Sequence, residues 1–573
     1  MADAALRSVP VRTERRFDAS VTVFVVATAV LALLVVVPLA WLFVISLQHA
    51  DGSPGLTVGN YIEAFTKSIY LRPIINSLVL AVSVATLATA VGAPLAWLVS
   101  RTNLPGRFVV RGLITAAFVT PSFVGAEAWI TLAAPNSGWI NRGLAALAHT
   151  EHGPFNIFSL AGAIFVMALY NVPYAFTFTA GALDLMSADL EDASATLGGS
   201  RLRTALSITL PLAAPAIAAG FIMAFLEAIA EFGAPAFLLI PARTQVVTTQ
   251  LYLFFQFPVR TELAAAYAMP LLAVTIALLA LQRRVLGRRK FTTVGGKGGR
   301  RRLIDLAKWR YPILALALIV PMCSVVIPYL ALLATSLSRQ WGRGPIPGNL
   351  TFYWYHWAFV ENPTTAAAIG HSLLYGVAAA TIAVSVAVAI AYAANRKLFR
   401  GAGFLGFVCT APFVVPGIVL AIGVYAAYSR PPLILYGTAW ILILAFAARF
   451  LPIAFSNLNN LLGNVHVDLE NAARTLGATR LRTIATITAP LLRRGMLASW
   501  LLVFIPAIRE LSSAIFLFTP GTATMTTQIF DFSDAGNYEA VASLAVIILV
   551  ITFGVITLAY RLLGRDFTTT RGG

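Results

Sequence analysis

Twelve apolar stretches run along this chain of 573 residues, and each is close to the roughly 20 residues that an α-helix needs to cross a bilayer. Only 11% of the residues are charged, whereas soluble proteins carry about 25%. Lipid offers no hydrogen-bond partner to the backbone, so each stretch is expected to be helical. We therefore predict an all-α polytopic membrane protein. Its spans are expected at approximately 20–46, 73–99, 110–132, 158–182, 213–240, 262–282, 312–337, 371–394, 404–428, 434–460, 492–518 and 540–562.

The distribution of positive charge predicts the orientation of these spans. With the N-terminus in the cytoplasm, 31 of the 41 Lys and Arg residues fall in inner segments and 8 in outer segments. The remaining two, Arg449 and Arg509, lie within spans. Because Lys and Arg concentrate on the cytoplasmic side, both termini are expected there, against membrane lipids. This bias accounts for the net charge of +18 without a nucleic-acid partner.

A polar island is repeated once in each half of the chain. The sequence from Leu190 to Leu212 is LEDASATLGGSRLRTALSITLPL, and that from Leu469 to Leu491 is LENAARTLGATRLRTIATITAPL. Aligned without gaps, the two agree at 14 of 23 positions. Asn76-Ser77-Leu78 and His371-Ser372-Leu373 also correspond, as do Thr248-Thr249-Gln250 and Thr526-Thr527-Gln528. The chain is therefore expected to hold two six-helix halves in the same orientation, a parallel repeat.

The repeat predicts five regions in the chain. These are a cytoplasmic tail over 1–19, a first half over 20–284, a linker over 285–311, a second half over 312–563 and a second tail over 564–573. The linker is basic and rich in glycine, as in flexible connections that lie against anionic lipid heads. It contains no phosphate-binding loop, because Phe291 stands where the first glycine is needed and Gly298 follows Lys297.

The islands resemble the cytoplasmic loop motif of permease subunits in bacterial ABC importers. The resemblance rests on Glu-x-Ala followed by Gly seven residues after the Glu, in both halves, although Asp192 and Asn471 replace the usual first Ala. In that family the loop forms a short coupling helix that docks on an ATPase subunit. The residues implied in docking are Glu191, Ala193, Gly198, Arg201, Pro211, Glu470, Ala472, Gly477, Arg480 and Pro490.

The resemblance also implies function, partners and location. A fused, two-lobed permease resembles the ferric-iron type, and Arg509-Glu510-Leu511-Ser512 favours that type over thiamine, phosphonate or polyamine permeases. Such a subunit works in the inner membrane and is not an enzyme. ATP and Mg are implied on two copies of a cytoplasmic ATPase subunit, and a periplasmic or lipid-anchored solute-binding protein is implied on the other face. No cofactor, metal site or catalytic residue is expected in this chain.

The residues of the islands have a physical interpretation of their own. Glu191 and Glu470 are expected in the first turn of a short helix, where a carboxylate complements the helix dipole. Gly198 and Gly477 are expected to end that helix, as a left-handed cap or a point of close backbone approach. The arginines that follow would face cytoplasm or lipid heads, and the prolines would mark the return to the membrane. An ordinary capped loop is the alternative for one copy, and the recurrence in both halves disfavours it.

Several charged residues fall inside predicted spans. Glu227 and Glu231 are expected on one face of span five, with Arg509 and Glu510 at the matching level of span eleven. Ionisable groups in a membrane usually face a cavity or a partner. They could line the translocation path, where carboxylates suit a cation, or brace the two spans, and the sequence does not decide between these. Arg449 is expected to extend toward the interface.

Two other classes of function were compared with the importer. A proton-coupled secondary transporter could use the membrane carboxylates Glu227, Glu231 and Glu510 as proton carriers, but it leaves the repeated islands without a role. An intramembrane enzyme lacks support, because neither a His-Glu-x-x-His pair nor a convincing Ser or Asp dyad occurs.

The predicted topology can be tested with reporter fusions. Fusions after residues 12, 200, 295, 475 and 568 should report the cytoplasm, because positive charge gathers in those segments. Fusions near residues 60, 145, 250, 345 and 525 should report the external side. One inverted pair of neighbouring loops would contradict the twelve-span arrangement.

Overall fold

The computed structural model describes residues 20–50, 53–186, 189–287 and 303–563, and within these ranges it contains helices and three isolated bridges but no strand. Ten helices are long and apolar enough to cross a membrane, and two bent helix pairs bring the number to 12 if each pair is one span. The predicted all-α polytopic fold is confirmed. The two tails and most of the linker lie outside the described residues.

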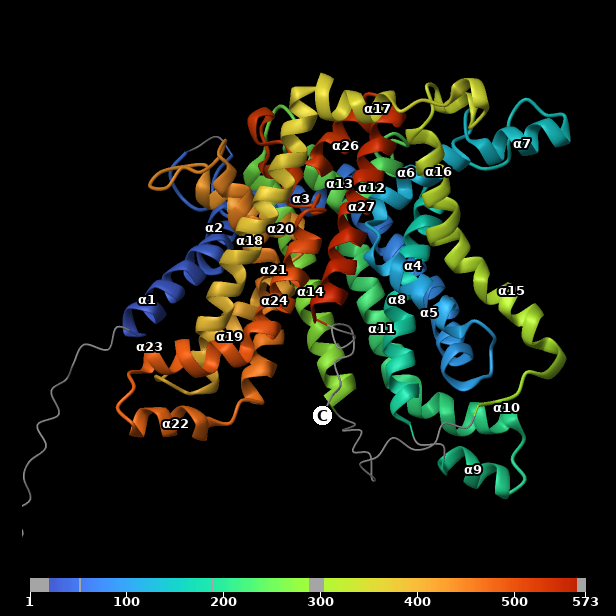
Figure 1. Cartoon of the computed structure of the whole chain (residues 1–573). Coiled ribbons are helices and arrows are strands. Elements are labelled where there is room, and N and C mark those ends of the chain that lie inside the picture. The colour runs from blue at the N-terminus through green and yellow to red at the C-terminus, as the bar shows by residue number, and fades with distance from the viewer. Residues whose placement is uncertain (1–19, 51–52, 187–188, 288–302, 564–573) are drawn as a thin grey trace, which may run out of the picture.

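The two halves contain the same succession of helices, except that α7 of the first half has no counterpart in the second (Figure 1). The first half consists of α1 (Ser20–Leu31), α2 (Val37–Ser46), α3 (Gly59–Thr66), α4 (Ser68–Arg101), α5 (Arg107–Val119), α6 (Ser122–Ala133), α7 (Trp139–Ala148), α8 (Leu160–Leu185), α9 (Asp189–Thr196), α10 (Arg201–Thr204), α11 (Leu210–Ala230), α12 (Gly233–Leu239), α13 (Val247–Leu253) and α14 (Thr261–Gly287). The second consists of α15 (Arg310–Pro321), α16 (Ile327–Ser336), α17 (Tyr353–His356), α18 (Pro363–Asn395), α19 (Ala402–Thr410), α20 (Gly417–Tyr428), α21 (Ala439–Gly463), α22 (Val467–Thr475), α23 (Arg480–Thr483), α24 (Ala489–Ala507), α25 (Ala514–Leu517), α26 (Met525–Asp534) and α27 (Tyr538–Leu563).

Spans three and nine are bent pairs of helices, which corrects their prediction as single straight spans. The chain turns by 101° between α5 and α6 and by 112° between the helix over 402–413 and α20. Pro121 and Pro416 stand at these bends in extended conformation. Proline has no N–H to continue a helix and disfavours helical geometry in the residue before it. The hydropathy stays high through both bends, which is why the apolar pattern did not reveal them.

Spans five and eleven end earlier than predicted. α11 ends at Ala230, and Glu231 caps it in extended conformation, so Glu227 and Glu231 do not share one helix face. α24 likewise ends at Ala507, three residues before Glu510. Short helices follow in both halves, α12 and α13 in the first and α25 and α26 in the second. The prediction of continuous helices over 213–240 and 492–518 is therefore wrong at their C-terminal ends.

Each half is built on three long helices. α4, α8 and α11 pack on one another in the first half, and α18, α21 and α24 do so in the second. In the first half two glycines allow this approach. A Cβ on Gly92 would lie 2.9 Å from the carbonyl oxygen of Val172, and one on Gly220 would lie 2.9 Å from the Cα of Ala175. Small residues at such contacts let membrane helices pack closely without a gain from the hydrophobic effect.

The first helices of each half pack against the other half. α1 lies against α18 and α2 against α20, whereas α15 lies against α5 and α16 against α6. Figure 1 shows α1 and α15 on opposite flanks of the bundle. The two halves are therefore interlocked at both flanks.

Aromatic side chains fill part of the junction between the halves. Phe232 of the first half lies 6.1 Å from Phe516 and 6.1 Å from Phe530 of the second, measured between ring centroids. Tyr252 and Phe255 of the first half also contact Phe516, at 6.2 and 5.0 Å. These contacts lie on the short helices that follow spans five and eleven. The broken ends of those spans are thus where the halves meet.

Candidate functional site

Two short polar helices and their turns form the repeated islands, and both lie at the same end of the bundle. Figure 1 shows α9 and α10 below one half and α22 and α23 below the other, with α7 and α17 at the opposite end. This placement agrees with a parallel repeat. Each island then continues through a π-helical turn, over Ala205–Thr209 or Ile484–Thr488, into α11 or α24. Single π-turns inside helices occur frequently at functional sites.

Gly198 and Gly477 end the two island helices as left-handed caps. Their φ angles are +79° and +87°. The amide of the next residue donates to a carbonyl five residues back, from Gly199 to Ser194 at 2.8 Å and from Ala478 to Ala473 at 3.1 Å. This is the Schellman pattern. A Cβ on either capping glycine would meet no atom within 4 Å, so the glycines serve the turn and not close packing within the chain.

A solvent-exposed leucine directly precedes each of these glycines. Leu197 is 89% exposed and Leu476 is 90% exposed. Ala193 and Ala472 on the preceding helices are exposed as well. An apolar side chain presented in this way, with small neighbours, suits burial in a partner. The sequence analysis did not single out these leucines, although the identity of Leu197 and Leu476 in the repeat was the signal that could have found them.

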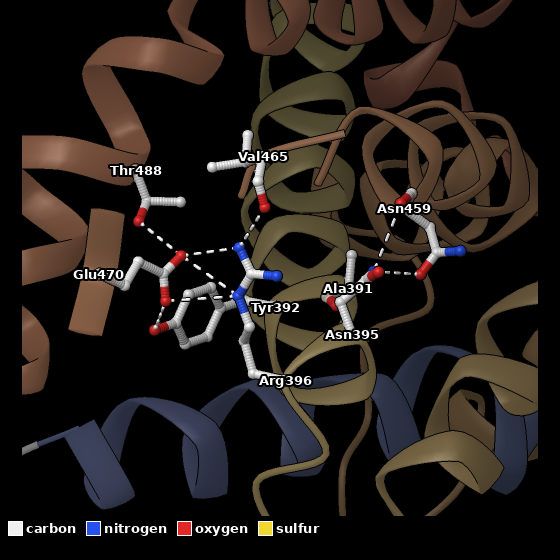
Figure 2. Close-up of polar contacts among 8 residues, drawn as sticks. All are labelled: Ala391, Tyr392, Asn395, Arg396, Asn459, Val465, Glu470 and Thr488. Atoms are coloured by element: carbon white, nitrogen blue, oxygen red, sulfur yellow. Dashed lines mark hydrogen bonds and ion pairs between the residues drawn. The ribbon is translucent and has the colours of Figure 1, made fainter. Parts of the chain in front are cut away.

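Glu470 lies inside the chain's own structure instead of facing outward. It is 4% exposed. Arg396, at the end of α18, pairs with its Oε1 through Nη2 at 2.9 Å, and the Tyr392 hydroxyl donates to Oε2 at 2.9 Å. Thr488, at the end of the π-helical turn, donates to Oε1 at 3.1 Å. Figure 2 shows these groups surrounding the carboxylate. The first-turn position predicted for Glu470 is confirmed.

Arg396 also fixes the segment that leads into α22. Its Nη2 donates to the carbonyl of Val465 at 3.1 Å, as Figure 2 shows. The neighbouring Asn395 donates to the side chain of Asn459 on α21 at 2.7 Å. The arginine therefore joins the end of one span to both the start and the carboxylate of the island helix.

The first half contains a weaker version of the same arrangement. Glu191 accepts a hydrogen bond from Thr209 at 2.8 Å, and its Oε2 lies 3.7 Å from Nη1 of Arg101. Arg101 donates to the carbonyl of Met186 at 3.2 Å, as Arg396 does to Val465. Trp97 stands where the second half has Tyr392, so the hydroxyl that holds Glu470 has no counterpart there. In both islands an arginine and a threonine of the chain bind the glutamate, but Glu470 has shorter contacts and one more donor than Glu191.

The burial of Glu470 has an effect on its ionisation. Burial acts to raise its pKa, but hydrogen bonds from Arg396, Tyr392 and Thr488 outweigh burial, and the pKa is lowered overall. The carboxylate is therefore ionised at neutral pH. Its stabilising contribution is present above the ordinary carboxyl pKa and is lost as the pH falls through the lowered value.

The other island residues occupy the ends of elements. Pro211 and Pro490 are the second residues of α11 and α24, directly after the π-helical turns, and as prolines they have no N–H to donate within the helix. Arg201 and Arg480 begin α10 and α23. The prolines therefore mark the point at which each π-helical turn passes into a long helix.

The charged residues predicted within spans come together at the junction of the halves. Arg449 of α21 pairs with Glu510, with Nε 3.0 Å from Oε2. Glu227 interacts electrostatically with both residues and with Arg509, and Glu231 interacts with Glu227. The expectation that Arg449 extends to the interface is wrong, because Glu510 holds its guanidinium inside. The partner lies 61 residues away in sequence, beyond the reach of local patterns.

Threonine hydroxyls stabilise the two helix breaks at these carboxylates. The hydroxyl of Thr248 donates to the carbonyl oxygen of Glu231 at 2.8 Å, and that of Thr526 donates to the carbonyl oxygen of Glu510 at 2.9 Å. A carbonyl freed from a helix in a water-poor region needs such a donor. The repeated Thr-Thr-Gln segments therefore supply a hydrogen-bond donor to the free carbonyl group at the helix break in each half.

Serines on the long helices support the same segments. The amide of Val247 donates to the hydroxyl of Ser77 at 2.7 Å, and the amide of Met525 donates to the hydroxyl of Ser372 at 2.8 Å. All four hydroxyls of this scaffold belong to sequences that the repeat had matched. In the described residues no group of three or more His, Cys, Asp and Glu side chains could hold a metal ion.

Comparison with known proteins finds the same protein family in both halves of the chain. The family described as the binding-protein-dependent transport system inner membrane component matches residues 88–291 and 383–568. A ferric transport system permease protein of Actinobacillus pleuropneumoniae is 27% identical over 492 residues, which cover 85% of this chain and 70% of that protein. A putative 2-aminoethylphosphonate transport system permease protein of Salmonella paratyphi A is 29% identical over 226 residues, 39% of this chain and 84% of that protein.

One solved structure is similar over part of the chain. It is a bacterial ABC transporter involved in the import of the acidic polysaccharide alginate, and it matches with a TM-score of 0.38 and 16% identity. The match covers 43% of this chain and 89% of that chain.

The unequal hold on the two glutamates can be tested by hydrogen exchange. Glu470→Gln leaves the Arg396 guanidinium without a charged partner in a site where breaking a pair costs about 3–5 kcal/mol. Amides of α22 should then exchange much faster. Glu191→Gln, the matched control, should change α9 less, because its arginine lies farther away. In the unsubstituted protein, α22 should loosen as the pH falls below the ordinary carboxyl pKa. Equal effects at both sites would contradict this account.

Proposed function

The chain belongs to the family of binding-protein-dependent transport system inner membrane components, and from this premise we propose that it is the fused permease of an ATP-driven importer of ferric iron. The observation that carries the proposal is the match of the family to both halves, together with a ferric permease that is similar over 85% of the chain. ATP and Mg would bind to two copies of a separate cytoplasmic ATPase subunit. A periplasmic or lipid-anchored solute-binding protein would deliver the ion, and both termini of this chain would be cytoplasmic.

The islands are proposed as the two ATPase-docking sites. What supports this is the pair of exposed leucines, Leu197 and Leu476, each beside a left-handed glycine on a turn that no other part of the described chain covers. Burial of an isolated leucine in a cleft contributes on the order of 2 kcal/mol. Ala193 and Ala472 would let the partner's backbone come close. Arg201 and Arg480 would contribute positive charge at the edge of each site.

We assign Glu191 and Glu470 a positioning role within these sites. Both carboxylates bind an arginine and a threonine of this chain, which holds each coupling helix on the span that it must move. Motion of a docked ATPase pair would then be transmitted through the glutamate to Arg101 on α4 or Arg396 on α18. Pro211 and Pro490 would begin the helices that carry the motion into the membrane.

The interior charges are proposed to border the translocation path. Glu227, Glu231 and Glu510 supply three carboxylates against the guanidinium groups of Arg449 and Arg509. Carboxylate oxygens at this point suit a passing cation. Glu227 is exposed although it lies within span α11, so it is the carboxylate best placed to meet an ion. A permease needs such contacts to be weak, since the ion must also leave.

The importer proposal is tested by uptake into vesicles that contain the permease, its ATPase subunit and a ferric-loaded binding protein. Gly198→Asp with Gly477→Asp should insert normally but lose most ATP-dependent uptake. Loss of a left-handed glycine costs about 1 kcal/mol, too little to unfold the bundle, whereas a misplaced charge in an interface costs several times more. Gly437→Asp is the matched control, because its glycine has φ +86° and open space around it but lies in the loop between α20 and α21, outside the islands.

Three results of this experiment would contradict the proposal in different ways. Normal uptake by the double aspartate variant would remove the docking role. Uptake that follows a proton gradient without ATP would indicate a secondary transporter. ATP-dependent uptake driven only by a binding protein loaded with thiamine, a phosphonate or a polyamine would keep the importer and change its substrate.

The path is tested by a pair of glutamine variants. Glu227→Gln should lower ferric uptake several-fold while the amount of protein in the membrane stays constant, because among the described residues this side chain forms no ion pair within 4 Å and loses a longer-range attraction to Arg449 and Arg509. Glu510→Gln should lower uptake and also reduce thermal stability, because Arg449 loses its partner. Unchanged uptake in Glu227→Gln would favour a bracing role for these charges.

A further inference from the structure

The last part of the linker is attached to the first half beside a coupling helix. The amide of Ile304 donates to the carbonyl of Arg101 at 2.8 Å, and the amide of Asn103 donates to the carbonyl of Ile304 at 3.1 Å. These bonds form a parallel bridge between Thr102 and Ile304. We call residues 304–306 the linker strap. It leads directly into α15, so the second half begins on the surface of the first.

Side chains complete the attachment. The Asn103 amide group donates to Oδ1 of Asp305 at 2.7 Å, and the amide of Leu306 donates to Oδ1 of Asn103 at 3.0 Å. Oδ1 of Asp305 also accepts from the amide of Ala307 at 3.0 Å. Both side chains are thus used as donor or acceptor across the strap. A bridge of two backbone bonds and two side-chain bonds fixes the turn after α4 in position.

That turn holds the arginine of the first coupling site. Arg101 is 3% exposed, pairs with Glu191 at 3.7 Å and donates to the carbonyl of Met186 at 3.2 Å. Its own carbonyl is the acceptor for the strap. The backbone of Arg101 is therefore held by the strap that leads into the second half, while its side chain holds α9 of the first half.

The first half does the same for the second through an apolar contact. Phe24 of α1 stacks on Tyr392 of α18, with the rings 6.2 Å apart and 4° from parallel. The hydroxyl of Tyr392 donates to Glu470 at 2.9 Å. Phe24 is 8% exposed, so this contact is part of the packed interior. The leading segment of each half thus supports the residue that binds the other half's coupling glutamate.

We propose that the two halves position each other's coupling helices, with Asn103 and Asp305 acting on α9 and Phe24 acting on α22. The inference rests on the proposed docking role of these helices and adds positioning residues outside the repeated islands. A change in the packing of one half then alters the position of the coupling helix in the other half. Because one contact is polar and the other aromatic, the two can be altered independently.

The proposal is tested by hydrogen exchange on the full chain in lipid nanodiscs, without any partner. Asn103→Ala with Asp305→Ala should speed exchange in α9 by about 3- to 10-fold, the loss expected from one or two hydrogen bonds, and leave α22 unchanged. Phe24→Ala should speed exchange in α22 by a similar factor and leave α9 unchanged. Lys308→Ala, an exposed charge four residues after Ile304, is the control and should change neither.

A conservative variant separates positioning from a general loss of stability. Asp305→Asn keeps an oxygen at the Oδ1 position, which can still accept from the Asn103 side-chain amide and from the amide of Ala307, so exchange in α9 should stay near the original rate. Phe24→Leu should restore α22 in part. The proposal would be overturned if Asn103→Ala with Asp305→Ala, or Phe24→Ala, accelerated exchange equally in α9 and α22. It would also be overturned if neither variant accelerated exchange in either helix.

A second readout connects the strap to transport. In the assembled importer, Asn103→Ala with Asp305→Ala should raise the number of ATP molecules hydrolysed for each ion taken up, whereas Asp305→Asn should leave this number near its original value. An unchanged ratio would overturn the positioning role even if exchange is faster. If the unsubstituted complex shows no ATP-dependent uptake, the proposed function fails, and the exchange measurement still decides whether the halves brace each other.

Discussion

Backbone groups that cannot find water are the constraint on which this structure depends. Within lipid every N–H and carbonyl must be paired inside the protein, so the spans are helices and any break needs a substitute donor or acceptor. At Glu231 and Glu510 the substitutes are the hydroxyls of Thr248 and Thr526. The breaks in turn allow α12 and α25 to bring aromatic residues to the junction of the halves. The charged residues gather where the backbone is already stabilised by polar side chains.

The sequence predicted the elements well and their interruptions poorly. Hydropathy and the repeat were sufficient for the spans, their parallel arrangement and the caps at Gly198 and Gly477, because each of these is a local property of the chain. The bends at Pro121 and Pro416 were missed, since both lie in apolar sequence and proline is tolerated in membrane helices. The pairing of Arg449 with Glu510 and the inward position of Glu470 depend on tertiary contacts, which no local pattern contains.

The two coupling sites differ although their sequences are similar. Glu470 is surrounded by three donors of the chain, whereas Glu191 has one close hydroxyl and a more distant arginine. The substitution of a tyrosine by Trp97 accounts for part of this difference, because indole cannot reach the carboxylate as a hydroxyl does. The linker strap supports the weaker site from outside. Fusion of two permease halves therefore gives each site a different means of support.

The crossing of the first helices has a consequence for biosynthesis. The ribosome completes α1 at residue 31, but its partner α18 begins at residue 363. At about 5–20 residues per second, the interval is roughly 15–70 s. During this time α1 contacts lipid or the insertion machinery with the face that later packs against α18. α15 emerges when α5 is already in place. The N-terminal helix is thus made first but meets its partner only after more than half of the chain has been synthesised, and early termination of translation would leave it unpaired.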